Sequence, residues 1–211
     1  MTGMTLPQQT WFGATAGYLG MWMAMMVPMM LPSLVPMLSR YHRSVRGVDG
    51  FHLHRLTALV GVGYFVVWAV LGAAAYAVGA GIMAIEVRWE TVAQWRPLAT
   101  GVVLLLAGCV QFTSWKARQL ALCREASARA GSAEPSVLGA FWHGLRLGVR
   151  CSLACGSLML ALLAIGTMSL VAMAAATLAI AGERLAPVPL RVARVAGVAI
   201  VLVGVLTIAW G

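Results

Sequence analysis

Acidic residues and the residue sets of common catalytic sites are nearly absent from this sequence. Only six of its 211 residues are Asp or Glu, and charged residues make up 10% of the chain. We find no Ser/His/Asp set, no phosphate-binding loop and no paired carboxylates along it. The sequence therefore gives no reason to expect an enzyme, although redox chemistry at a bound metal would need none of these motifs.

The sequence also lacks the cysteine pattern of a disulfide-bonded protein and the basic domain of a nucleic-acid-binding one. It has four cysteines, and most of them lie in or beside apolar runs. The formal net charge is +9, but the arginines flank the apolar runs and form no separate basic region. We therefore expect no nucleic acid partner, and we interpret the positive charge as a determinant of membrane orientation.

Apolar sequence, by contrast, is abundant. Hydrophobic residues make up 61% of the chain, and the mean hydropathy is +0.88. Several apolar runs are longer than a helix in a soluble core requires. We predict an all-α fold, a single transmembrane helical domain over residues 1–211, with the lipid bilayer as its first partner.

The apolar runs predict a bundle of six short spans. Four spans follow from the hydropathy alone, at residues 11–38, 56–83, 98–115 and 195–210. The uncharged run of 32 residues at 151–182 would be about 48 Å long as one helix, against a hydrocarbon core of about 30 Å. We split it near Gly166 and Thr167, because two crossings leave only Arg88 and Arg96 of the fifteen Lys and Arg residues outside the cytoplasm. One long tilted helix in place of these two gives a five-span alternative, with three more arginines on the outer side.

The first span contains the stretch LGMWMAMMVPMMLPSLVP at residues 19–36, which is rich in methionine and proline. Prolines recur at every fourth position, and this predicts a kinked helix whose released carbonyls need other partners. At helical spacing the side chains form two adjacent rows, with Met21, Met25 and Met29 in one and Trp22, Met26 and Met30 in the other. The methionines are either flexible fillers of irregular gaps or soft ligands for Cu(I).

The stretch GVRCSLACGSLM places two thiols and a thioether on one helix face. Cys151, Cys155 and Met159 are spaced four residues apart, so successive turns present them to the same side. Sulfur ligands in a two- or three-coordinate arrangement suit Cu(I), whereas Zn²⁺ usually requires a fourth ligand. In the alternative interpretation the cysteines are small buried side chains at a close helix contact marked by Gly156 and Ser157.

Some polar residues near the ends of the spans also have two interpretations. His42, His52 and His54, in the basic loop after the first span, carry imidazoles that bind metals but also suit a solvated interface. We expect Glu183 to form a local ion pair with the adjacent Arg184. A Glu183 inside the bundle would instead be a functional candidate, because intramembrane carboxylates are costly.

Four further residues with polar or reactive side chains fall in or after the third span. We expect Gln111 and Thr113 to form interhelical hydrogen bonds. Lys116 marks the end of that span, and Cys123 in the following loop is expected to be a cytoplasmic thiol.

Two stretches, WMAMMVPMMLPS (residues 22–33) and GVRCSLACGSLM (residues 148–159), resemble the motifs of a bacterial family. Its members are described as predicted metal-binding integral membrane proteins, and some are labelled copper chaperones. The segments GYFVVW, AGCVQFTSWK, GTMSLVAM and GERLAP add weaker support, so the resemblance covers most of the chain. The family's cysteine stretch is similar to C-x-G-C-C-W, and this chain departs from it at Leu153, Ala154 and Gly156, which removes one thiol and the tryptophan. Gln119 stands where the family commonly has another cysteine. The resemblance implies a copper-handling membrane protein.

We therefore predict an integral protein of the bacterial inner membrane that binds Cu(I) and passes it to a partner or across the membrane. The partner would be a small metallochaperone or a cuproprotein, and homo- and hetero-oligomers are both compatible with the sequence. The predicted ligands are Cys151, Cys155 and Met159, with Met25, Met26, Met29 and Met30 as a thioether relay. Two alternatives are a structural subunit that binds no metal and a small-solute transporter gated by the proline-broken helix.

Overall fold

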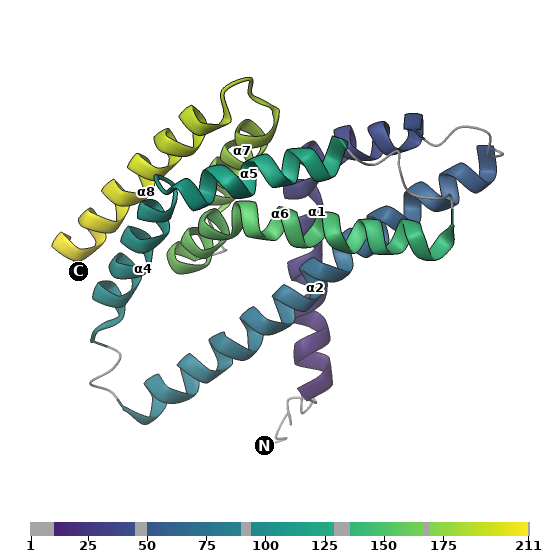
Figure 1. Ribbon diagram of the computed structural model, residues 1–211. Helices are drawn as coiled ribbons and strands as arrows, with labels where there is room; N and C mark the ends of the chain where they lie inside the picture. Colours follow the sequence, from purple (N-terminus) through teal and green to yellow (C-terminus); the bar gives the residue numbers. More distant parts are fainter. Residues whose placement is uncertain (1–10, 45–49, 90–93, 129–135, 167–168, 211) are drawn as a thin grey trace, which may run out of the picture.

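The computed structural model describes residues 11–44, 50–89, 94–128, 136–166 and 169–210. Within these ranges the chain is helical and contains no strand, which confirms the predicted all-α class (Figure 1). The helices are α1 (Trp11–Ser44), α2 (Gly50–Arg88), α4 (Arg96–Val110), α5 (Ser114–Ala128), α6 (Val137–Ile165), α7 (Leu170–Leu185) and α8 (Pro189–Trp210).

Four of the described helices are long and apolar enough to cross a membrane, as expected of a membrane protein. They are α1, α2, α6 and α8, and the bent pair α4 and α5 would make a fifth span if the two together cross once. By length alone α7 does not qualify, because it has 16 residues and a span needs about 20. Six spans therefore stay a prediction.

The helices differ from the predicted spans mainly at the third one. The backbone tightens after α4, where Gln111, Phe112 and Thr113 donate to carbonyls three residues back. It then turns by 64° into α5, which covers residues that we expected to form a loop. The charged residues of that segment indicate only that it lies outside the hydrocarbon core, and they do not exclude a helix. Ala, Leu, Gln, Lys, Arg and Glu, which make up most of it, are all good helix formers.

The long apolar run after Cys151 is broken where the sequence suggested. Gly166 ends α6 with φ at 106°, a backbone conformation that favours glycine, and its N–H donates to the Leu162 carbonyl. Ser169 then caps α7, because its hydroxyl accepts a hydrogen bond from the Ala172 N–H. Thr167, the other residue of the predicted break, lies outside the described residues.

Glycines allow two helix pairs to pack closely. A Cβ on Gly63 of α2 would lie 2.5 Å from the Phe141 carbonyl oxygen of α6, and one on Gly144 of α6 would collide with the Val60 carbonyl of α2. Helices α4 and α8 meet in the same way, through Gly101 and Gly108 on one side and Gly197 and Gly204 on the other. Small residues at such contacts are typical of helix association in membranes.

Helix α1 passes through the middle of the molecule and packs mainly against α2 and α7. It is one helix despite the three prolines inside it, Pro28, Pro32 and Pro36. Figure 1 shows that its first turns and its last turns run in different directions, as expected for a proline-kinked helix. Helices α1, α2, α5, α6, α7 and α8 all contribute residues to one buried cluster.

Candidate metal centre

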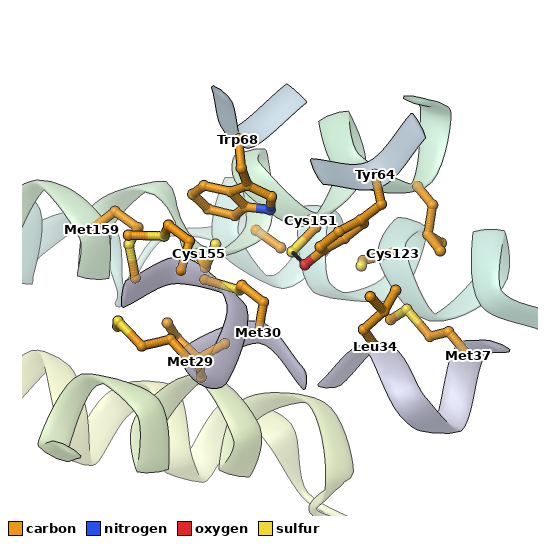
Figure 2. Packing of buried hydrophobic residues seen from close by; sticks show 14 of the residues in the cluster. Met29, Met30, Leu34, Met37, Tyr64, Trp68, Cys123, Cys151, Cys155 and Met159 are labelled. Carbon is orange, nitrogen blue, oxygen red and sulfur yellow. Dashed lines mark hydrogen bonds between the residues drawn. The ribbon is translucent and has the colours of Figure 1, made fainter. Parts of the chain in front are cut away.

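The two cysteines of α6 lie at the centre of that buried cluster. Cys151 and Cys155 are on successive turns and are fully buried, and Met159 follows them one turn later, also buried. The Cys151 thiol is 2.8 Å from the Tyr64 hydroxyl of α2, a hydrogen bond in which either atom can be the donor. Figure 2 shows Cys151 beside Tyr64, with Cys155 and Met159 farther along α6.

The methionines of α1 approach the same cluster from the opposite side. Met26, Met29 and Met30 are buried in it, and Met25 is partly buried against it. Figure 2 shows Met30 reaching from α1 toward the cysteines, with Met29 below it. Met37, one of the last methionines of α1, is buried there too. The structure therefore brings six of the seven predicted sulfur ligands into one interior, with Met25 at its edge.

The two predicted methionine rows face different surroundings. Met21 is 52% exposed, so the row that it begins points partly away from the protein interior. The row of Trp22, Met26 and Met30 faces inward, and the Trp22 indole N–H donates to the Trp68 carbonyl of α2 at 3.0 Å. This bond, together with the contact of the indole with Gly72, fixes the rotation of α1 relative to α2.

A buried polar network borders the cysteines on the side of α5 and α7. The Lys116 ammonium pairs with a Glu183 carboxylate oxygen at 2.7 Å and donates to the Ala154 carbonyl at 2.5 Å. The Gln111 amide donates to the other oxygen of Glu183 at 3.1 Å. Arg184 donates to the Cys151 carbonyl at 3.3 Å. Two cationic side chains thus contact the turn of α6 that carries both thiols.

Sequence reasoning missed most of this network. We expected Glu183 to pair with Arg184, but it is buried and pairs with Lys116, which we had placed at a span end. The interhelical bond of Gln111 is confirmed, whereas Thr113 donates to the Val110 carbonyl within its own turn. The available signal was a carboxylate next to a long apolar run, which is a functional candidate whenever it lies inside a bundle.

The histidines of the first loop and Cys123 were the other candidate metal ligands or reactive side chains. The rings of His42 and His54 are 5.2 Å apart, and both residues lie near the junction of α1 and α2. Cys123, which we expected in a loop as a cytoplasmic thiol, lies on α5 and is buried in the central cluster. Within the described part of the chain, no group of three or more His, Cys, Asp or Glu side chains is placed to hold a metal ion.

The donor set around Cys151 and Cys155 fits a soft monovalent ion. It consists of two thiols one turn apart, with thioethers of Met159 and Met30 in the same buried cluster. Thiolate and thioether ligands select Cu(I), which accepts two or three of them, whereas zinc sites usually have four nitrogen, oxygen or sulfur ligands.

Comparison with known proteins identifies the family. A family model described as PpoB2, copper chaperone, matches residues 19–207. The chain belongs to this family. The PpoB2 match includes both the methionine and proline stretch of α1 and the cysteines of α6, and it confirms the resemblance to copper-chaperone-like membrane proteins. No curated protein and no solved structure gives a significant match to the chain.

Proposed function

We propose that this PpoB2 family member binds Cu(I) within a bacterial inner membrane and passes the ion to a partner protein or across the membrane. The observation that carries the proposal is the burial of Cys151 and Cys155, one turn apart, in a cluster that also contains the sulfurs of Met26, Met29, Met30 and Met159. The family name indicates copper as the ion, and thiolates and thioethers are the ligands that Cu(I) prefers.

The proposed chemistry assigns separate roles to the thiols and the thioethers. Cys151 and Cys155 bind the ion as thiolates, so binding releases protons and the affinity depends on pH. Met159 and Met30 supply neutral sulfurs that carry no proton, so they can take up and release the ion without a proton transfer. The methionines along α1, Met26, Met29 and Met30, then form a path by which the ion approaches the cysteines, with Met25 at its edge.

Tyr64 holds the Cys151 side chain in place for this chemistry. Its hydroxyl is buried and 2.8 Å from the thiol. When Cys151 is a thiolate, the hydroxyl becomes the donor, and a hydrogen bond to an ionised acceptor is stronger than one between neutral groups. Tyr64 therefore favours the form of Cys151 that binds the ion.

The test is the copper content of detergent-purified protein under reducing conditions. Wild type should bind about one Cu(I) per chain, as expected for one pair of thiolates, and Cys151→Ser/Cys155→Ser should bind almost none. Cys109→Ser is the matched control, because Cys109 is an exposed cysteine on α4 and its loss should leave copper binding unchanged.

Two outcomes would contradict the proposal. Wild type that binds no Cu(I) would show that the sulfurs only fill space, as methionine often does in irregular packing. A double variant with undiminished copper would place the site elsewhere. X-ray absorption at the copper edge provides an independent check, because it should detect sulfur and no nitrogen or oxygen in the first coordination sphere.

A further inference from the structure

Arg184 stands out among the charged groups around the cysteines because, in the part of the chain that the structure describes, it forms no salt bridge with a carboxylate. It is located at the C-terminal end of α7 and donates from one terminal nitrogen to the Cys151 carbonyl. Its other terminal nitrogen is buried and has no hydrogen-bond partner among the described residues. Within the same part of the chain, salt bridges involve Lys116 with Glu183 and Arg96 with Glu86, and Arg184 takes part in neither.

Lys116 differs from Arg184 in this respect. Its ammonium is bonded to the Glu183 carboxylate and to the Ala154 carbonyl. The pair is therefore neutral as a unit, and Gln111 satisfies the second oxygen of the carboxylate. Arg184 is partly buried, and its charge has no carboxylate partner among the salt bridges of the described residues. Arg150 precedes Cys151 in the sequence and is partly buried like Arg184, but among the described residues it is Arg184 that donates to the Cys151 carbonyl and has a fully buried terminal nitrogen.

The same guanidinium also interacts with sulfur. It lies close enough to the thiols of Cys151 and of Cys123, the buried cysteine of α5, to act on them electrostatically. A guanidinium keeps its proton inside proteins, so this positive charge is permanent. The guanidinium also has a donor to spare, because one buried nitrogen of its planar group has no hydrogen-bond partner among the described residues.

The balance of charge depends on which ion binds. Two thiolates with Cu(I) or Ag(I) form a complex with one net negative charge, whereas two thiolates with Zn²⁺ form a neutral complex. Opposite charges at short distance interact far more strongly in a buried site than in water. One arginine without a carboxylate partner therefore neutralises the bound monovalent complex and contributes little to the divalent one.

We propose that Arg184 is the counter-charge that makes the Cys151 and Cys155 site prefer a monovalent soft ion over a divalent one. This inference rests on the proposed function, because it assigns selectivity to the same pair of thiols. In this role Arg184 is a positioning and selectivity residue that does not itself ligate the ion.

The experiment compares Arg184→Gln and Arg184→Lys with wild type and with Arg191→Gln. Arg191 is an exposed arginine on α8, so its replacement removes one positive charge that solvent already screens. Affinities for Cu(I) and Ag(I) are measured by competition with a chromophoric chelator under reducing conditions, and the affinity for Zn²⁺ is measured with a zinc indicator. Using two monovalent ions separates the effect of charge from copper redox chemistry.

Arg184→Gln should bind Cu(I) and Ag(I) about 10- to 100-fold more weakly, the range expected for the loss of one close charge pair at a partly screened site. Its affinity for Zn²⁺ should change little, so the ratio of monovalent to divalent affinity should fall. Arg184→Lys retains the charge and should keep the ratio close to that of wild type. Arg191→Gln should behave as wild type in all three titrations.

Three outcomes would overturn the inference. They are an unchanged ratio in Arg184→Gln, an equal loss of affinity for all three ions, and a loss of the ratio in Arg184→Lys. The last outcome decides the matter if Arg184→Gln does not yield folded protein. Failure of the proposed function is recognised separately, because wild type would then bind no Cu(I). Wild type that binds copper with the same selectivity as Arg184→Gln would contradict only the role of Arg184.

Discussion

At the scale of single residues, the ion pair of Lys116 and Glu183 requires two charges to be removed from water. Both side chains are fully buried, and each has lost its hydration. Such a pair often contributes little net stability, because the desolvation of both charges offsets their attraction. Removing one partner is different, because it leaves the other charge buried and uncompensated.

Lys116→Met should therefore destabilise the protein by about 3 to 5 kcal/mol, since it leaves Glu183 without its counter-ion. Arg118→Met is the control, because Arg118 is an exposed cation two residues away on α5 and its loss should be nearly neutral. Thermal unfolding in detergent measures both. Equal melting temperatures for the two variants would contradict the structural role of the pair, and the double variant Lys116→Met/Glu183→Leu should recover part of the loss.

Tyr64 acts on a single atom, the Cys151 sulfur. Tyr64→Phe keeps the ring and removes the hydroxyl that lies 2.8 Å from the thiol. We expect Cu(I) affinity to fall about tenfold, with stoichiometry unchanged, because a hydrogen bond to an ionised group contributes about 1.5 to 3 kcal/mol. Tyr76→Phe is the matched control, since Tyr76 is also on α2 but its ring packs on Tyr18, away from the cysteines. A similar affinity for the two variants would show that the Tyr64 hydroxyl does not support the bound form.

At the scale of helices, the α2 and α6 contact positions the cysteines relative to Tyr64. Gly63 and Gly144 bring the two backbones together, and Gly148 packs against the Tyr64 carbonyl one turn before Cys151. Because the contacts of Gly63 and Gly144 involve backbone atoms, a side chain at either of these two positions cannot be accommodated by a change of rotamer. The distance between Tyr64 and Cys151 is therefore a consequence of this helix contact.

Gly144→Ala tests the contact directly. Its new Cβ would collide with the Val60 carbonyl, and overpacking of this kind costs about 1 to 3 kcal/mol. Gly156→Ala is a control on the same helix, where a Cβ would meet nothing within 4 Å and alanine favours the helix by up to about 1 kcal/mol. Gly144→Ala should therefore melt at a lower temperature than wild type, and Gly156→Ala at the same or a higher one. The opposite order would refute the close α2 and α6 packing.

Helix α1 has a prediction of its own, which concerns transfer more than binding. Met29→Leu/Met30→Leu retains side-chain volume and should cost less than about 1.5 kcal/mol of stability for each substitution. The thiols remain, so copper stoichiometry should be unchanged, while release of Cu(I) to a soluble chelator should slow about tenfold, which corresponds to about 1.4 kcal/mol in the barrier. Met21→Leu, at an exposed position of the same helix, should release copper at the wild-type rate. Equal release rates would leave the methionines with a packing role alone.

The sequence predicted these elements unevenly, for physical reasons that particular residues illustrate. Hydropathy located the long helices, and the glycine at 166 marked a break that only a flexible backbone position allows. Helix α5 was not predicted, because charged residues were interpreted as a loop although they are good helix formers. The partner of Glu183 lies 67 residues away on another helix, and no local pattern identifies such a pair. Whether the sulfurs of α1 face those of α6 likewise depends on the direction in which α1 bends. The prolines predict that α1 bends, but they do not specify the direction of the bend.

At the scale of the whole molecule, the length of α6 bears on how the chain crosses the membrane. Its 29 residues would extend about 43 Å, well beyond a hydrocarbon core of about 30 Å. The half before Cys151 carries His143, Arg146 and Arg150, and the half after it is uncharged. Helix α7 then returns antiparallel to that second half, because Arg184 at its end contacts Cys151. This arrangement supports a membrane boundary close to the cysteines.

We therefore expect a reporter fused between α7 and α8, at residues 186–188, to be found in the cytoplasm. In that case the second half of α6 and all of α7 are two short spans, which a bilayer accommodates by local thinning and by arginines that reach the interface. It also keeps Arg184, Arg191 and Arg194 on the side that positively charged residues favour. Fusions between α1 and α2 should report the cytoplasm and fusions between α2 and α4 the outer side. If the fusion after α7 reports the outer side while both control fusions report as expected, the protein has five spans. The cysteines then lie deeper in the membrane, and an ion coming from either side would need the α1 methionines to reach them.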